Sequence, residues 1–71
     1  MERGILDTLS RATASLNRVD YRTLNADART QYDQAVRFVS QARDALGVRN
    51  LVFAANLADK AQTLASQLAG R

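Results

Sequence analysis

The side chains that most often carry catalysis or bind metal ions are scarce in this chain of 71 residues. It contains no histidine and no cysteine. It therefore offers no imidazole base, no thiolate nucleophile and none of the usual zinc ligands. Its three glycines lie at positions 4, 47 and 70, too far apart to form a glycine-rich loop around a phosphate.

Carboxylates, serines and a single lysine are the reactive groups that remain. Two carboxylates could act together as general acid and base, but the aspartates are predicted to lie on exposed helix faces or at helix ends. These residues are Asp7, Asp20, Asp27, Asp33, Asp44 and Asp59. A serine nucleophile would need Lys60 as its base, and a helical hairpin supplies no oxyanion site. We therefore expect a protein that is not an enzyme, with no catalytic residue, cofactor, metal ion or small-molecule substrate.

Arginine supplies most of the positive charge. Nine arginines and Lys60 face seven acidic residues, which gives a net charge of +3. Arginine side chains could bind the phosphates of a nucleic acid. The candidate residues for such a face are Arg11, Arg18, Arg22 and Arg29. Acidic residues are spread along the whole chain, so no segment carries a block of positive charge, and nucleic-acid binding is kept as the alternative function.

Helices must position all these groups, because 13 alanines, 9 leucines and the absence of proline favour them. Apolar residues at spacings of three and four predict a first helix over residues 2–20. They are Ile5, Leu9, Ala12, Leu16 and Val19. On the other side of this helix, Asp7 and Arg11 are four residues apart, the spacing of a surface ion pair.

A second helix is predicted over residues 25–46, with Asn25 as its N-cap. Its apolar stripe consists of Ala28, Tyr32, Ala35, Val39, Ala42 and Leu46. Tyr21 and Leu24 then become linker residues that fold back over the end of the core. One continuous helix through this region is the alternative, because neither proline nor glycine interrupts it.

A third helix is predicted over residues 50–69, with Asn50 as its N-cap and Gly47 as the left-handed residue that closes the preceding helix. Such a short connection makes the second and third helices an antiparallel hairpin. The third helix carries a bulky ridge of Phe53, Leu57, Leu64 and Leu68. Beside it runs a ridge of small residues, Ala54, Ala58, Ala61 and Ala65.

The predicted fold is therefore all-α, a helical hairpin plus an N-terminal helix in a three-helix bundle. Residues 1–71 are expected to form one helical domain, either complete or excised from a longer protein. No stretch approaches the roughly 20 apolar residues that a membrane span needs, and the N-terminus lacks the apolar core of a signal peptide. We expect a soluble chain, cytoplasmic if it is complete.

Within residues 38–61, large Phe38 is followed by small Ala42 in the first helix, and the second helix carries Ala54 and Lys60-Ala61. This pattern resembles a single tetratricopeptide hairpin. The chain departs from the family pattern because Ala45 and Ala58 stand where larger residues are common, and because the closing proline is missing. The resemblance implies one hairpin, without the concave groove of a repeat array. Residues 16–68 are also similar to helical tail segments of uncharacterised bacterial proteins, which implies no function.

Small size and alanine content indicate a protein partner. A chain of this length buries only about 60–65% of its unfolded surface, and alanine gains less by burial than leucine. The apolar faces of the second and third helices are wider than the surface that a three-helix bundle has to bury. We therefore expect a protein–protein interaction or oligomerisation module that binds itself or a larger protein. Its expected contact ridge is Phe53, Leu57, Leu64 and Leu68.

Salt dependence separates the two functions. If the arginine face binds DNA or RNA, affinity should fall steeply as salt rises, because bound phosphates release counterions. An interaction module should show no measurable nucleic-acid binding at about 50 mM salt. Fluorescence anisotropy with labelled DNA and RNA over a salt series measures this, and tight, salt-sensitive binding would contradict the leading hypothesis.

Overall fold

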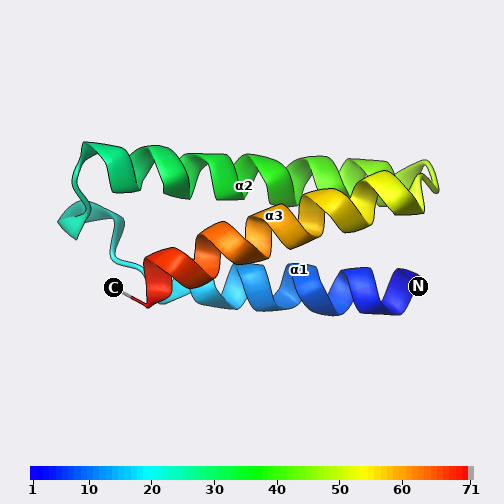
Figure 1. Cartoon of the computed structure of the whole chain (residues 1–71), viewed down its shortest axis with the longest axis horizontal. Helices are drawn as coiled ribbons and strands as arrows, with labels where there is room; N and C mark the ends of the chain where they lie inside the picture. The colour runs from blue at the N-terminus through cyan, green and yellow to red at the C-terminus, as the bar shows by residue number, and fades with distance from the viewer. Residues whose placement is uncertain (71) are drawn as a thin grey trace.

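Three α-helices and one short 3-10 turn make up the computed structural model, which describes residues 1–70 (Figure 1). The elements are α1 (Glu2–Asn17), η1 (Tyr21–Thr23), α2 (Ala26–Gly47) and α3 (Leu51–Ala69). α2 and α3 form the predicted antiparallel hairpin, and α1 lies alongside. The all-α three-helix prediction is therefore confirmed, in a molecule of 36 × 17 × 13 Å.

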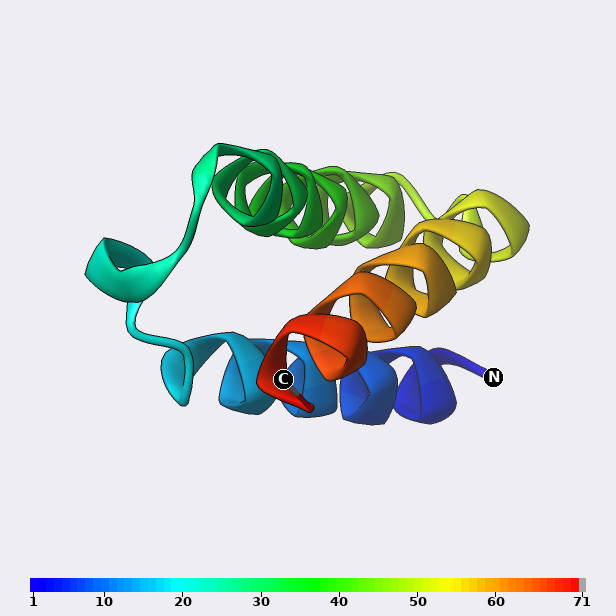
Figure 2. The same cartoon turned by 60° about the vertical axis from the view of Figure 1, so that its left-hand side comes forward.

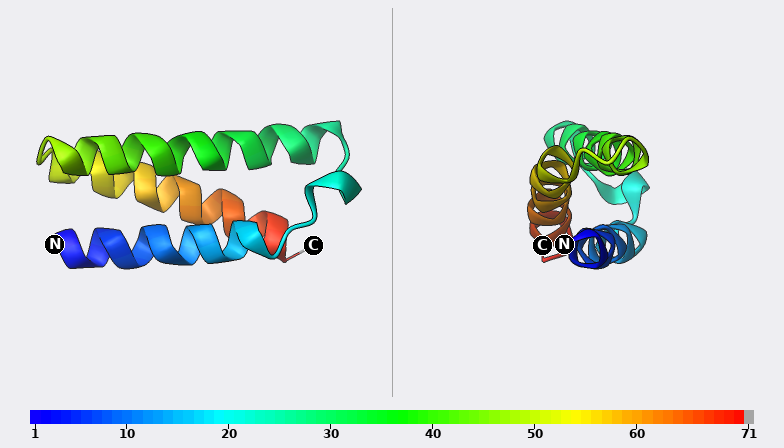
Figure 3. Two further views of the ribbon diagram at one scale, coloured as in Figure 1. Left: turned by 180° about the vertical axis from the view of Figure 1, so that it is seen from behind. Right: turned by 90° about the vertical axis from the view of Figure 1, so that its right-hand side faces the viewer.

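α3 holds the other two helices together. It packs extensively against both α1 and α2, whereas α1 and α2 contact each other much less. Figure 2 shows α3 running obliquely from the α2 side to the α1 side. In the view along the long axis, α3 bridges the other two helices on one side (Figure 3). The bundle is therefore closed by α3 and more open between α1 and α2.

Alanine dominates the contact surface of α3. Ala54, Ala58, Ala61 and Ala65 are all fully buried, and nine of the fifteen buried side chains in the core are alanines. The larger buried side chains are Ile5, Leu9, Leu16, Val39, Leu57 and Leu68. A small side chain lets helices approach closely but removes little apolar area from water. The predicted small-residue ridge is thus the centre of the core.

α1 ends three residues earlier than predicted, at Asn17, and a linker separates it from α2. The prediction of a helix to Asp20, and the alternative of one continuous helix, are both wrong. Local hydrogen bonds are the reason: Oδ1 of Asp20 accepts from the Arg22 N–H at 3.1 Å, and its carbonyl accepts from the Thr23 hydroxyl at 2.8 Å. Such bonds compete with helical ones.

Asn25 begins α2 as predicted. Its Oδ1 accepts a hydrogen bond from the Ala28 N–H at 2.8 Å, which satisfies one of the free donors in the first turn. Asn50 does the same for α3, accepting from the Phe53 N–H at 3.4 Å. Both predicted N-caps, Asn25 and Asn50, are therefore confirmed.

The left-handed residue of the α2–α3 turn is Arg49, with φ of 62°, and not Gly47 as predicted. Gly47 is the last residue of α2. The Asn50 N–H donates to the Ala45 carbonyl at 2.9 Å, and the Arg49 N–H donates to the Leu46 carbonyl at 3.0 Å. This pair of bonds is the Schellman motif, which places the left-handed residue two positions after the helix ends.

Two ion pairs occur within residues 1–70. Arg49 pairs with Glu2 at 3.7 Å and ties the α2–α3 turn to the start of α1. Arg22 pairs with Asp20 at 3.7 Å within the linker. The predicted pair of Asp7 and Arg11 does not form. An exposed ion pair at this spacing gains too little free energy to hold both side chains in one geometry.

Substituting Gly47 should stabilise the protein. Gly47→Ala should raise the free energy of unfolding by about 0.5–1 kcal/mol, because Gly47 is helical and no atom lies within 4 Å of an added Cβ. Urea denaturation followed by circular dichroism measures the change. If Gly47→Ala instead lowers the free energy of unfolding, the residue with the left-handed backbone conformation is Gly47 and not Arg49.

Two variants at Arg49 provide the matched control. Arg49→Gly and Arg49→Ala both lose the ion pair with Glu2, so their difference isolates the backbone conformation. The glycine variant should be more stable than the alanine variant by about 1 kcal/mol.

Candidate functional site

Groups capable of acid–base or metal chemistry lie on the surface of the molecule. All seven carboxylates are exposed, and the core of residues 1–70 contains no polar or charged side chain. Within the same residues, no three acidic side chains gather closely enough to hold a metal ion. The features that could serve a function are therefore surfaces and pockets.

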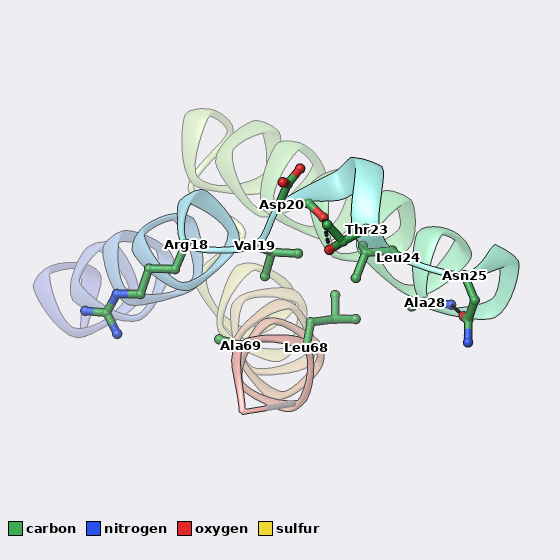
Figure 4. A pocket seen from close by; sticks show the side chains of 9 residues that line it. All are labelled: Arg18, Val19, Asp20, Thr23, Leu24, Asn25, Ala28, Leu68 and Ala69. Atoms are coloured by element: carbon green, nitrogen blue, oxygen red, sulfur yellow. Dashed lines mark hydrogen bonds between the residues drawn. The ribbon is translucent and has the colours of Figure 1, made fainter.

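A pocket of about 500 Å³ lies where the linker meets the ends of α1 and α3 (Figure 4). Its apolar side chains, Val19, Leu24 and Leu68, point toward one another, whereas Arg18 extends away from them. Leu24 packs against the core, which confirms the prediction that it folds back over the core end. The pocket gathers apolar packing groups and no reactive cluster.

Tyr21 does not cover the end of the core as predicted. Its ring stacks edge-on against Tyr32 of α2, with the ring centroids 5.1 Å apart, and its hydroxyl donates to Oδ2 of Asp33 at 3.3 Å. Aromatic pairs favour this geometry. The linker is thus fastened to the side of α2, and Tyr21 remains 38% exposed.

Arg29 completes this fastening. Its Nε donates to the Tyr21 carbonyl at 3.3 Å, its Nη2 donates to the Arg22 carbonyl at 3.2 Å, and its guanidinium lies 5.3 Å from the centre of the Tyr21 ring. Cation–π contact and hydrogen bonds to exposed carbonyls are each weak, but here one side chain makes all of them. Arg29 therefore has a structural role.

The four candidate nucleic-acid arginines lie in different parts of the fold. Arg11 lies on the exposed side of α1, Arg18 follows its last turn, and Arg22 belongs to the linker. Arg22 is already paired with Asp20, and Arg29 is bound to the linker. Among residues 1–70, no ion pair or linker contact engages the other two candidates, Arg11 and Arg18.

The expected contact ridge of α3 is divided by the fold. Leu57 and Leu68 are core residues, 5% and 3% exposed, so this chain alone covers them. Phe53 is 52% exposed and Leu64 is partly buried. Of the four residues, only Phe53 and Leu64 are placed where a partner could reach them.

Phe53 and Leu64 lie on the outer side of the hairpin, together with residues of α2. We call this surface the hairpin face. It consists of Gln34, Phe38, Gln41, Asp44, Ala45 and Val48 from the α2 side, with Asn50, Phe53, Asp59, Lys60, Thr63 and Leu64 from the α3 side. Two open hollows mark it, one of about 390 Å³ beside Phe53 and one of about 420 Å³ over Phe38 and Leu64.

Uncharged side chains line most of the hairpin face. The polar groups around Phe38 and Phe53 are three amides, of Gln34, Gln41 and Asn50, and three charged side chains, of Asp44, Asp59 and Lys60, besides Thr63. Lys60 lies over the Phe38 ring at 6.0 Å. Enrichment of aromatic residues is typical of the central part of protein interfaces. Gln41 and Val48 were not among the expected contact residues, although with Phe38 they form a helical stripe beside the buried one.

A second groove, of about 360 Å³, separates α1 from α2. Leu16, Tyr32, Val36 and Val39 supply its apolar lining, and Thr13, Asn17, Ser40, Arg43 and Asp44 supply its polar lining. The Thr13 hydroxyl is buried there without a hydrogen-bond partner. This groove is more polar than the hairpin face, and no aromatic side chain protrudes from it as Phe53 does.

Removing the Arg29 side chain should loosen the linker. Arg29→Ala should lower the free energy of unfolding by about 1 kcal/mol, because two hydrogen bonds and a cation–π contact are lost. Arg11→Ala, a change at another exposed helical arginine, is the control and should change stability by less than about 0.5 kcal/mol. Equal effects in urea denaturation would show that Arg29 does not fasten the linker.

No helix among residues 1–70 is both long and apolar enough to span a bilayer.

No protein family, curated protein or solved structure matches the chain. Its function therefore has to be inferred from its own surface.

Proposed function

We propose that this chain is a non-enzymatic protein–protein interaction module that acts through the hairpin face. Exposure of Phe53 is the observation that carries the proposal. A phenylalanine that is 52% exposed lines one hollow of the hairpin face, and Phe38 and Leu64 line the other. Aromatic anchors of this kind contribute most of the binding energy in protein interfaces.

The weak core supports the same function. An alanine-rich core gains little from burial, so the folded state of the isolated chain has a small stability margin. Its accessible surface is 4671 Å², against about 4,400 Å² for a compact monomer of this mass. A partner that covers the hairpin face would bury additional apolar area and stabilise the fold.

The exposed apolar side chains also favour this face. Phe53 and Val48, which are 52% and 77% exposed, line the same hollow. The exposed side of α1 carries Arg3, Asp7 and Arg11, and such groups are costly to remove from water. Nucleic-acid binding gains no such support, because Arg29 would have to leave the linker to reach a phosphate.

Photo-crosslinking at position 53 tests the proposal. A benzoylphenylalanine replaces Phe53 in the chain produced in its own host cell, and the adducts are identified by mass. We expect adducts with protein from position 53. Position 66 is the matched control, because Ser66 is exposed on α3 and lies about 140° around the helix from Phe53, outside the hairpin face. This position should give at most one tenth of the yield.

The identity and position of the adducts decide the outcome. An adduct with another protein or with a second copy supports the module. Equal yields at positions 53 and 66, or no protein adduct at all, would show that the hairpin face is not an interaction surface.

A further inference from the structure

We propose that the Arg22–Thr23 peptide bond is a cleavage site for an arginine-specific endoprotease, and that Arg29 guards this bond. The bond lies in the linker between α1 and α2, and no linker residue belongs to the hairpin face. The site is therefore independent of the proposed function. It would regulate how α1 is connected to the rest of the chain.

The Arg22 side chain is accessible to a protease. It is 92% exposed, and among residues 1–70 its one ion pair is the 3.7 Å contact with Asp20, an exposed pair of the weak kind. Thr23, on the other side of the bond, is exposed too. Arginine-specific proteases of the trypsin type bind the guanidinium through a carboxylate in the specificity pocket. That carboxylate can replace Asp20 as the partner of Arg22.

The backbone on either side of the bond is already extended. Asp20, Leu24 and Asn25 have ψ angles of 101°, 143° and 177°. The 3-10 turn between them is held by the Thr23 N–H, which donates to the Asp20 carbonyl at 3.0 Å, and by the Leu24 N–H, which donates to the Tyr21 carbonyl at 3.2 Å. Short exposed segments of this kind open locally and are preferred sites of proteolytic cleavage. The bond can thus be presented without unfolding a helix.

Arg29 binds the oxygen atom that a protease has to use. Its Nη2 donates to the Arg22 carbonyl oxygen at 3.2 Å, and its Nε donates to the Tyr21 carbonyl at 3.3 Å. During hydrolysis the nucleophile attacks the Arg22 carbonyl carbon, and the carbonyl oxygen enters the oxyanion hole of the protease. Arg29 and the oxyanion hole therefore compete for the same oxygen, so cleavage has to wait until the Arg29 hydrogen bond breaks.

Cleavage consumes one water molecule. The nucleophile of the protease forms an acyl bond with the Arg22 carbonyl carbon, while the Thr23 nitrogen gains a proton and leaves as an amine. Water then hydrolyses the acyl bond, which leaves a carboxylate on Arg22 and restores the nucleophile. Residues 1–22 are afterwards held to residues 23–71 by packing alone. Without the covalent connection, this association depends on concentration.

The two other arginines outside the α-helices of residues 1–70 are poorer sites. Arg18 precedes Val19, which packs against the core and cannot enter a protease without leaving it. Arg49 lies in the short α2–α3 turn, where its N–H and that of Asn50 donate to carbonyls of α2 at 3.0 and 2.9 Å. This turn cannot become extended unless the end of a helix unwinds.

Limited digestion of the full chain with trypsin, followed by mass spectrometry, tests the site. The first products should be residues 1–22 and residues 23–71. Arg22→Gln should slow the first cut at least about tenfold, because the specificity pocket loses its guanidinium. Arg18→Gln, in the same linker, is the matched control and should leave the rate at Arg22 within about twofold of the wild type. A first cut at any other bond, or an unchanged rate in Arg22→Gln, would overturn the proposal.

Arg29→Ala tests the guard. It should speed the cut after Arg22 at least about fivefold, because the linker opens more often and its carbonyl is released. Ile5→Val is the matched control, since it weakens the buried core by a similar amount without touching the linker. If local opening suffices, its rate should stay within about twofold of the wild type. Equal acceleration in both variants, or none in Arg29→Ala, would show that Arg29 does not guard the bond.

Discussion

Close approach of α3 to both neighbouring helices is the constraint on which the rest of the structure depends. Four fully buried alanines, Ala54, Ala58, Ala61 and Ala65, make this approach possible, because each adds only a methyl group between the helices. α1 and α2 then lie on two sides of α3 and contact each other little. The open groove, the exposed hairpin face and the modest stability expected of the core all follow from this one helix surface.

Helix number, order and approximate bounds could be predicted, because the apolar spacing and the capping residues Asn25 and Asn50 are local signals. The errors also have local causes. Bonds from Asp20 end α1 early, and the competition between these bonds and the helix is decided by geometry that the sequence does not display. At the other turn, glycine is the usual left-handed residue, but α2 extends through Gly47 and leaves that conformation to Arg49.

The candidate site could be predicted only in part. Spacing placed Phe53, Leu57, Leu64 and Leu68 on one ridge, but the direction from which α1 and α2 approach determines which of them is covered. Leu57 and Leu68 are buried, so Phe53 and Leu64 remain for a partner. The resemblance of residues 38–61 to a single tetratricopeptide hairpin stays a prediction.

Phe53 and the hollow over Phe38 and Leu64 both lie on the hairpin face. A single partner that covers this face would therefore cover both features, and neither would stay exposed to start a further contact. Features on opposite sides of a molecule would instead allow head-to-tail growth into an open fibre. The placement of the exposed aromatic side chain thus favours closed contacts over open ones.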